Sequence, residues 1–390
     1  HKEKKMKKYS ILGLVLIIAI TMTLSGCGLF EAPGSGSKDP AKIFTTGTGQ
    51  ESDPYIVSTR EQVDAVRYDL DACYKLEADI DLDEYTMEPI GTETSPFTGE
   101  FDGNGHTLNY LDLSVSEESY EGVGLFGCLR GAKIENLTVD KISAPDLAKI
   151  KNLGILAGIA ASDSIIENCT VKGEMNGYNN IGGLVGKLSS RSIARNCRMD
   201  IILSGNEHTG GITGECLDST IENCSVEGDI TCRSTYPGRS WAGGFVGNMI
   251  SGEIKNSYSL ATVEVTDSAS FAMYNGTAGG LIGNFQAGKM SFCYVSGEVS
   301  GYHNPGGVYG NWDNGEFEQV INNTDGTGLI ANGSADFIKT EGSPLDDDYV
   351  VIRPSGIYGY NSAQMKTPSL FSEWDQDIWD ISEDYYPRFK

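Results

Sequence analysis

Carboxylates that could do chemistry stand close together at one point of the sequence. Asp79, Asp81 and Asp83 alternate with apolar residues, so a strand would place all three on one face. Clustered carboxylates suit Ca²⁺, which a lyase would combine with a basic residue that abstracts a proton next to a carbonyl. No Arg or Lys motif accompanies the three aspartates. We therefore expect a polar strand face and no cofactor, with a calcium site as the alternative.

A second set of acids contains Asp325, within an Asn-Thr-Asp-Gly stretch, and Asp346, the first of three aspartates. Their order resembles that of the paired carboxylates of polygalacturonases, where one acid protonates the leaving oxygen and the other activates water. The remainder of that pattern is absent, because no His follows His303 and the residues around Arg353 do not match the basic motif. We interpret both acids as solvated loop residues and predict no catalytic residue.

Two further motifs were tested against the context that their chemistry requires. Gly122-Val-Gly-Leu-Phe-Gly127 fits G-x-G-x-x-G, but dinucleotide binding needs a strand before it and a helix after it, and neither is predicted. Zinc peptidases need H-E-x-x-H, and the four histidines of this chain stand alone. We therefore expect no metal site and no metallopeptidase domain in this chain.

The charge of the chain excludes one class of partner. The sequence has 29 Lys and Arg residues against 54 Asp and Glu residues, a formal net charge of −25. Such a surface repels nucleic-acid phosphates, so we expect no nucleic acid as a partner. With 39% hydrophobic residues, the composition is that of a globular protein.

The N-terminal residues predict export and attachment to a membrane. Five lysines within the first eight residues precede the apolar run Ile11–Ile20, which is too short to span a bilayer, so residues 1–26 are predicted to be a signal peptide. Leu24-Ser-Gly-Cys27 resembles the bacterial lipobox, which implies a lipoprotein with its lipid on Cys27. Acyl chains there would anchor the protein to the extracellular face of the cell membrane, with residues 27–50 as a flexible tether.

A glycine-rich phrase recurs seven times, with closing glycines 27 to 36 residues apart, which is the signature of a solenoid. A second phrase follows most copies, such as Ile166-Glu-Asn-Cys-Thr-Val171, with its asparagine nine or ten residues after the closing glycine. Its apolar and polar residues alternate as in a strand. Each repeat is too small to bury its own apolar side. We therefore predict an all-β fold in which successive coils stack as parallel sheets, a β-helix.

Stacked coils place equivalent residues in columns along the axis. One column is predicted to be an asparagine ladder with a structural role, since Asn tolerates the bend at the end of a strand and its amide can bond to the coil beside it. Its members are Asn136, Asn168, Asn196, Asn223 and Asn256.

The position after the ladder holds small or apolar residues that we expect to point inward: Leu137, Cys169, Cys197, Cys224, Ser257, Cys293 and Val320. Disulfides or a metal site in this column are the alternative, but C-x-x-C spacing and neighbouring histidines are absent. Four further cysteines, Cys73, Cys128, Cys216 and Cys232, could pair in an exported protein, and the sequence leaves this open.

The glycine phrase resembles the GLUG motif, which is found in bacterial surface proteins and beside the N-terminal regions of IgA1-specific metallopeptidases. Residues 51–122 resemble the segment that usually precedes such repeats, 123–330 the repeats themselves, and 331–390 the segment that closes them. The resemblance implies a right-handed parallel β-helix on the cell surface with an adhesive role, and it implies no shared active site.

Both ends of the solenoid need covers, because open sheet edges aggregate. Ser58-Thr-Arg-Glu61 reads as a capping box ahead of Val63, Val66 and Leu70, whose spacing predicts a short amphipathic helix over the first coil. Residues 331–390 lose the repeat and are expected to form a C-terminal cap over the last coil.

Aromatic residues in the coil turns could stack on sugar rings, although each one alone is expected to pack into the core or a turn. They are Tyr178, Tyr236, Trp241, Tyr258, Tyr274, Tyr302, Tyr309 and Trp312. The hypothesis is a non-catalytic, membrane-anchored adhesin that binds a glycan or a host extracellular protein. The alternatives are a diverged β-helix polysaccharide lyase or glycoside hydrolase and a purely structural spacer.

Overall fold

The computed structural model describes residues 39–83, 85–113, 115, 120–143, 150–234, 240–267, 276–301, 305–323, 325, 337–339, 349–351, 355, 357–382 and 384–390. The parallel β-helix expected from the repeats is confirmed. In a typical coil the chain runs through β15 (Ile181–Gly182), β16 (Val185–Ser189), β17 (Ile193–Arg195) and β18 (Arg198–Gly205). The next coil then begins, and each strand pairs in parallel with its counterparts in the neighbouring coils.

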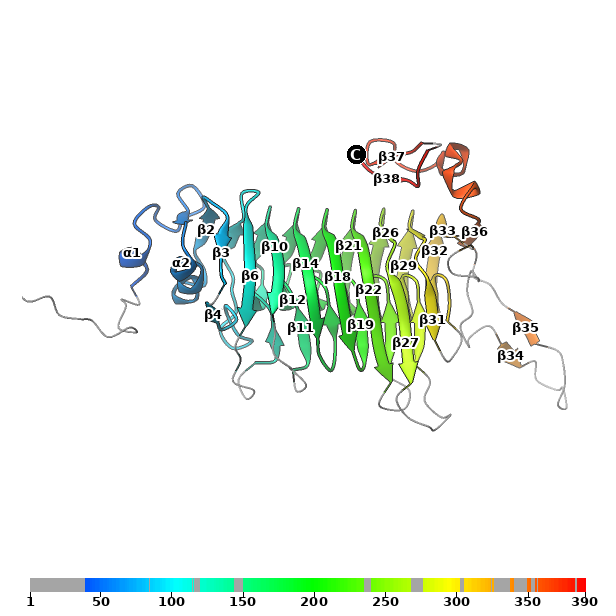
Figure 1. Cartoon of the computed structure of the whole chain (residues 1–390), viewed down its shortest axis with the longest axis horizontal. Helices are drawn as coiled ribbons and strands as arrows, with labels where there is room; N and C mark the ends of the chain where they lie inside the picture. Colours follow the sequence, from blue (N-terminus) through cyan, green and yellow to red (C-terminus); the bar gives the residue numbers. More distant parts are fainter. Residues whose placement is uncertain are drawn as a thin grey trace, which may run out of the picture. The chain divides into compact units, whose positions relative to one another are not determined.

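Stacking of the coils produces three sheets, and Figure 1 shows their strands side by side. Sheet 1 contains the strands of the glycine phrase: β7 (Gly122–Val123), β11 (Asn152–Gly154), β15, β19 (His208–Gly210), β23 (Trp241–Gly243) and β28 (Thr277–Gly279).

Sheet 2 has two rows of strands that merge near its C-terminal end. One row is β8 (Phe126–Arg130), β12 (Ala157–Ala161), β16, β20 (Thr213–Leu217) and β24 (Val246–Met249). The other is β1 (Tyr55–Val57), β2 (Cys73–Leu76), β5 (Glu100–Asp102), β9 (Lys133–Glu135), β13 (Ile165–Glu167), β17, β21 (Ser219–Glu222) and β25 (Gly252–Lys255). The long strands β29 (Ile282–Ser291) and β32 (Tyr309–Glu318) join them.

Sheet 3 follows the asparagine turn of each coil. Its strands are β3 (Ile80–Asp81), β6 (Thr107–Leu113), β10 (Thr138–Ser143), β14 (Thr170–Asn176), β18, β22 (Ser225–Ser234), β26 (Tyr258–Ser259), β30 (Tyr294–Val295), β33 (Val320–Asn323) and β36 (Ile357–Tyr360). Three shorter strands pair at its side: β4 (Thr86–Met87), β27 (Thr262–Asp267) and β31 (Val299–Gly301).

Outside these sheets lie short helices and two antiparallel strand pairs. They are α1 (Pro40–Ile43), α2 (Arg60–Ala65), the 3₁₀ helices Val66–Tyr68, Gln364–Lys366 and Pro368–Phe371, the pair β34 (Phe337–Lys339) with β35 (Tyr349–Val351), and the pair β37 (Trp379–Asp380) with β38 (Arg388–Phe389). No helix in the described ranges is both long and apolar enough to cross a bilayer.

The three glycines of the phrase Ile181–Gly186 are required by close approaches of backbone from three directions. A Cβ on Gly182 would lie 2.0 Å from the carbonyl oxygen of Val185 in the same turn. A Cβ on Gly183 would lie 2.3 Å from the oxygen of Gly211 in the next coil, and one on Gly186 would lie 2.3 Å from the backbone nitrogen of Leu153 in the preceding coil. These glycines therefore allow the backbone to pack closely both within the turn and between neighbouring coils.

The interior is one continuous core, and the column that follows the asparagine ladder lies within it as expected. Its seven side chains, from Leu137 to Val320, are at most 1% exposed. Val63 of α2 and Val66 of the 3₁₀ helix that follows it join the same core, and both are fully buried. Burial of these columns is the main favourable contribution to the stability of a fold whose single coils cannot stand alone.

The predicted N-terminal helix is present, but its cap lies one residue later than expected. Thr59, and not Ser58, is the N-cap, and its side chain accepts a hydrogen bond from the Gln62 amide at 3.3 Å. The Gln62 side chain in turn accepts from the Ser58 amide at 2.8 Å. These two hydrogen bonds form a capping box from Thr59 and Gln62, because Thr is a favoured N-cap residue and Gln is favoured three positions later.

The C-terminal residues fold back onto the side of the solenoid. β36 extends sheet 3 beyond β33, while Trp374 and Trp379 pack against Tyr294 and Ile321 on the outward face of that sheet. The contact is reflected in one outward column of sheet 3, which is polar in the early coils and aromatic or aliphatic under the C-terminal segment. In register order it reads Thr107, Thr138, Thr170, Arg198, Ser225, Tyr258, Tyr294, Ile321 and Tyr358.

Candidate binding surface

The asparagine ladder runs along the turn between sheets 2 and 3. All five asparagines have a left-handed backbone, with φ between +49° and +55°. Their amides bond from coil to coil, with Asn168 donating to Asn136 at 3.1 Å, Asn196 to Asn168 at 3.1 Å and Asn223 to Asn196 at 2.9 Å. The first member, Asn136, donates to the Asp102 carboxylate at 3.0 Å. These bonds link the first four members of the ladder at the bend of each coil, whereas the buried Oδ1 of Asn223 has no hydrogen-bond partner among the described residues.

A column of ion pairs lies beside the ladder, on the outward face of sheet 2. Lys133 contacts three carboxylates, Glu135 at 2.7 Å, Glu100 at 3.4 Å and Glu167 at 3.5 Å. Arg195 reaches Glu167 from the other side at 2.5 Å. The hydrogen bond to Glu135 is the largest cause of the raised pKa of Lys133, and it outweighs the opposing effect of burial.

The ion-pair column was not foreseen in the sequence analysis, although a signal for it was present. The residue before each ladder asparagine is charged, and its sign changes along the chain: Glu135, Glu167, Arg195, Glu222 and Lys255. Parallel in-register stacking converts this one-dimensional pattern into contacts between neighbouring coils, such as Lys255 with Glu222 at 3.4 Å.

The three aspartates considered for calcium are exposed and alternate with buried residues, but only Asp81 lies within a strand, β3. Their oxygens are used locally. Asp79 accepts from the Thr107 amide at 2.9 Å and lies 3.3 Å from the Nδ1 of His106. Asp81 accepts from the Asp83 amide at 2.8 Å. Within the described part of the chain, no group of three or more His, Cys, Asp or Glu side chains could hold a metal ion.

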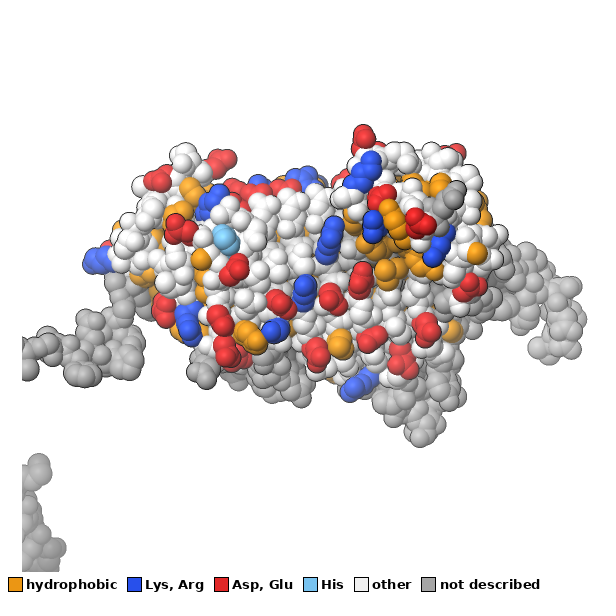
Figure 2. Space-filling model, turned by 45° about the horizontal axis from the view of Figure 1, so that its top comes forward, with side chains coloured by type: hydrophobic (Ala, Val, Ile, Leu, Met, Phe, Trp, Pro, Cys, Tyr) orange, Lys and Arg blue, Asp and Glu red, His pale blue; other side chains and the backbone are white. Residues whose placement is uncertain are grey.

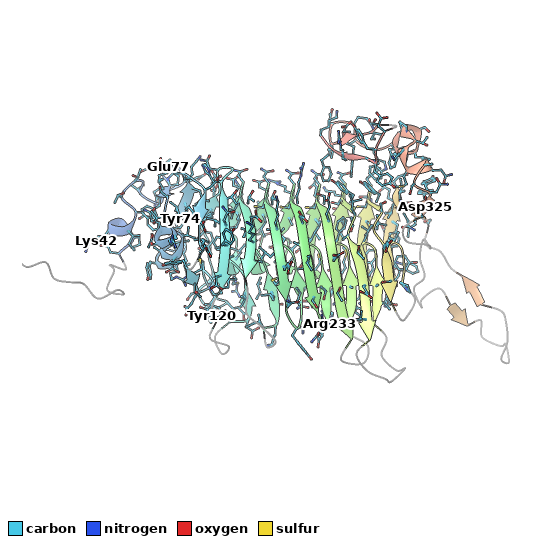
Figure 3. All side chains as sticks on the ribbon, viewed as in Figure 1. Lys42, Tyr74, Glu77, Tyr120, Arg233 and Asp325 are labelled. Carbon is cyan, nitrogen blue, oxygen red and sulfur yellow. The ribbon has the colours of Figure 1, made fainter. Side chains whose placement is uncertain are left out.

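Asp325 lies where the chain leaves the last coil, and Figure 3 labels it there. Its carboxylate accepts from the Ser362 amide at 2.8 Å, and hydrogen bonds from Ser362 lower its pKa. The neighbouring Asn323 donates to the hydroxyl groups of Ser296, Ser362 and Tyr386. Asp325 therefore helps to join the last coil to the C-terminal segment. Its proposed companion, Asp346, lies outside the described residues.

The eight cysteines of the described residues are free thiols. In the core column each Sγ donates to the carbonyl two residues earlier: Cys169 to Glu167 at 3.3 Å, Cys197 to Arg195 at 3.2 Å and Cys224 to Glu222 at 3.2 Å. Burial raises the pKa of Cys216, Cys232 and Cys293 to about 12, which disfavours the reactive thiolate. Cys27, the expected lipid site, lies outside the described residues.

The aromatic residues of the coil turns do not form one exposed row in the described ranges. Tyr309 is fully buried and packs near Trp312, with ring centroids 6.3 Å apart. Trp241 stacks on His208 at 4.8 Å, and Tyr258 stacks on Tyr294 at 5.0 Å. Tyr236, Tyr274 and Tyr302 lie outside the described residues. The turn aromatics thus contribute to packing more than to a glycan platform.

A pocket of about 270 Å³ lies where the C-terminal segment meets sheet 3. The solenoid contributes Asn196, Arg198 and Asn223, and the C-terminal segment contributes Asp377, Ile378, Phe389 and Lys390. On this side of the molecule, acidic and basic side chains are interspersed and hydrophobic side chains gather beside the C-terminal segment (Figure 2). Sequence reasoning missed this pocket because its two walls are more than 150 residues apart.

Known proteins resemble parts of this chain. Halomucin of Haloquadratum walsbyi is 32% identical over 150 residues, which cover 34% of this chain and 2% of halomucin. A proposed Gly-rich membrane protein of Evansella cellulosilytica is 27% identical over 143 residues, 34% of this chain and 16% of that protein. Zinc metalloprotease ZmpC of Streptococcus pneumoniae is 25% identical over 313 residues, 78% of this chain and 15% of the protease. The chain thus spans a small part of each of these relatives.

A solved structure supports the fold. The crystal structure of a proposed immunoglobulin A1 protease from Bacteroides ovatus matches 92% of this chain and 99% of its own, with a TM-score of 0.58 and 19% identity. The model of the GLUG motif matches residues 205–231, which run from the end of β18 into β22 and so make up one coil. The match confirms the expected resemblance, because the chain contains a GLUG motif within a parallel β-helix.

Proposed function

We propose that this chain is a cell-surface protein, anchored by a lipid on Cys27, whose solenoid binds an extracellular glycan or host protein without catalysing a reaction. The names of two relatives, halomucin and a Gly-rich membrane protein, support a surface location. The N-terminal lysines, the apolar run and the lipobox-like Leu24-Ser-Gly-Cys27 support the anchor. A solenoid supports binding because its stacked coils offer long, regular surfaces.

The ion-pair column supports the proposal that the chain is not catalytic. β-Helix hydrolases and lyases need carboxylates that are free to exchange protons, with one pKa raised toward the working pH. Here Glu100, Glu135 and Glu167 all contact one lysine. Burial acts to raise the pKa of Asp102, but hydrogen bonds from Asn136, from the Asn104 amide and from Lys75 outweigh it, and the pKa is lowered. These acids are therefore engaged in contacts that hold neighbouring coils together.

One observation favours the alternative of a diverged glycoside hydrolase. Burial, followed by the hydrogen bond and the charge of Asp71, raises the pKa of Asp69. A carboxyl group whose pKa is raised beside a second carboxyl group is the arrangement from which glycosidases draw a general acid. The pair lies beside the first coils, in the turn between α2 and β2.

A product scan distinguishes the two functions. The full chain is incubated with plant, bacterial and host polysaccharides in the presence of Ca²⁺, and the products are analysed by mass spectrometry, while polymer retention on the immobilised chain is measured in parallel. The proposal expects retained polymer and no new oligosaccharides. New oligosaccharides that disappear with Asp69→Asn would establish the hydrolase instead.

The anchor is tested separately in a bacterial host that is fed a radiolabelled fatty acid. The proposal expects the label on the wild-type chain in the membrane fraction, and an unlabelled Cys27→Ser chain that leaves this fraction. Cys73→Ser is the matched control, since it removes a partly exposed cysteine and leaves the lipobox-like sequence intact. Equal labelling of the wild-type and Cys27→Ser chains would contradict a lipid on Cys27.

A further inference from the structure

The pocket between sheet 3 and the C-terminal segment has two walls of different origin. Asn196 and Asn223 belong to the asparagine ladder, and Arg198 is the first residue of β18. The opposite wall is the open end of the β37–β38 pair, where the Lys390 amide donates to the Ile378 carbonyl at 3.1 Å. Both walls are thus held by backbone structure, and the pocket is formed before any ligand arrives.

Arg198 and Lys390 are the two cationic side chains of the pocket. Among the residues that the structure describes, neither Arg198 nor Lys390 forms an ion pair, whereas Lys75, Lys133 and Arg195 on sheet 2 all do. The chain has 54 acidic and 29 basic residues, so two unpaired cations that face one pocket are a distinctive feature. The side chains that line the pocket also include the carboxylate of Asp377.

The coil structure does not require an arginine at position 198. Its register partners in the two neighbouring coils are Thr170 and Ser225, and both fit the same outward column. The C-terminal segment covers the aromatic part of that column, which begins at Tyr258. Arg198 lies two coils before Tyr258. The arginine therefore lies at the border of the C-terminal segment, where it faces the pocket and is not needed to pack the sheet.

The pocket also has an apolar side and several amide groups. Phe389 is held in place by Tyr258, at 5.1 Å between ring centroids, and by Trp379, at 4.9 Å. Ile378 lies beside it, and the amides of Asn196 and Asn223 supply neutral polar groups. A sugar ring presents the matching combination, with C–H groups for an apolar wall and hydroxyl groups for amides and a carboxylate.

We infer that this pocket binds one carboxylate-bearing sugar residue of an acidic extracellular polysaccharide, with Arg198 and Lys390 on the sugar carboxylate and the apolar side of the ring on Phe389 and Ile378. The inference deepens the proposed glycan-binding function and rests on it. The pocket volume of about 270 Å³ lies just below the roughly 300 Å³ at which pockets for drug-sized ligands begin, and a single sugar unit is smaller than such ligands. Arginine suits the task because its planar donors match a carboxylate.

The experiment measures binding of the full chain to trigalacturonate, a hyaluronan tetrasaccharide and sialyllactose by isothermal titration calorimetry, with maltotriose and lactose as neutral probes. Arg198→Thr replaces the arginine with the residue type that Thr170 has at the same register position, so folding is expected to be retained. Lys172→Thr is the matched control, because it removes one positive charge from the neighbouring strand β14 and lies outside the pocket. Thermal unfolding of all three chains is measured alongside.

The inference expects that at least one acidic probe binds about tenfold more tightly than the neutral probes, that Arg198→Thr removes about a factor of ten in affinity, and that Lys172→Thr leaves it unchanged, as for a hydrogen bond to a charged group. Equal affinity of the two variants, or equal binding of acidic and neutral probes, would overturn it. If the Arg198→Thr chain still retains polysaccharide, the pocket is not the binding site, but the proposed function is unaffected. If the wild-type chain retains no polysaccharide, both proposals are wrong.

Discussion

The phenolic O–H of Tyr294 donates to the backbone carbonyl of Pro387 at 2.6 Å, which joins a coil of the solenoid to a residue 93 positions later. The Tyr294 ring stacks on Tyr258 with 5.0 Å between centroids, and it also lies near Trp374 and Trp379. This contact couples the C-terminal segment to sheet 3 through a group that can ionise. It therefore makes the docking of the segment sensitive to high pH.

Alkaline pH is expected to release the C-terminal segment. Burial, followed by the charges of Tyr258 and Glu227, raises the pKa of Tyr294 above its ordinary value of 10.0. The unfolded chain would ionise first, so the stabilisation is present below pH 10 and is lost as the pH rises beyond it. Tryptophan fluorescence between pH 8 and 12 should report this loss through Trp374 and Trp379.

Tyr294→Phe should lower stability at neutral pH by about 1 kcal/mol through the lost hydrogen bond, and should flatten the alkaline transition. Tyr110→Phe is the control, because Tyr110 is 41% exposed on β6. An alkaline transition of the same midpoint and amplitude in wild type and Tyr294→Phe would show that another group governs the release.

Asp102 is expected to cause part of the loss of stability at acid pH. Its pKa is lowered below the ordinary 3.8, because hydrogen bonds from Asn136, the Asn104 amide and Lys75 outweigh the effect of burial. The stabilisation is thus present above about pH 3.8 and is lost as the pH falls through the folded-state pKa. Asp102→Asn should weaken the fall in melting temperature between pH 4 and pH 2. Asp229→Asn, on the exposed face of β22, should retain the wild-type slope.

The closing glycine of a phrase should not tolerate a side chain. Gly186→Ala would place a Cβ 2.3 Å from the Leu153 backbone nitrogen, so the coils would have to separate. We expect a loss of roughly 1–3 kcal/mol in the free energy of unfolding, as for other overpacked cores. Gly301→Ala is the control, because its nearest contact would be 3.6 Å and no steric cost is expected. Urea unfolding measures both, and equal stabilities would disprove the steric explanation.

The ladder asparagines should contribute through both their backbone conformation and their amides. Asn168 has φ of +54° and bonds to Asn136 and Asn196. Asn168→Gly keeps a residue that accepts this backbone and loses only the side-chain bonds, at about 0.5–1.5 kcal/mol each. Asn168→Ala adds the strain of a left-handed residue, about 1–2 kcal/mol. Alanine should therefore be more destabilising than glycine, and the reverse order would show that backbone strain is unimportant here.

Some features of the fold could be predicted from residue types alone, because each depends on a single position of the repeat. The inward column from Leu137 to Val320 was visible as small or apolar residues at one register position, and all seven are buried. The cap of α2 was misplaced by one residue because Ser58 and Thr59 are both capping types. Only the backbone geometry shows that Thr59 begins the helix.

The candidate site could not be predicted in the same way. Arg198 reads in the sequence as an ordinary exposed residue after a core cysteine, and Lys390 as a charged residue beyond the repeat. They line one pocket because the aromatic side chains of Tyr258 and Tyr294 bind the C-terminal segment to the side of sheet 3. That contact joins the repeat region to the C-terminal segment, which has no repeat, so no periodic pattern predicts it.

The sequence by itself determined the β-helix, since glycines that admit close backbone contact and asparagines that accept a left-handed turn recur once in every coil. Local chemistry repeated at one period leaves little freedom for another fold. The tertiary structure decided which charges meet across neighbouring coils, such as Lys133 with Glu167, and where the C-terminal segment docks. These contacts depend on the register between coils and on packing over long sequence separations, and a linear pattern does not specify either one.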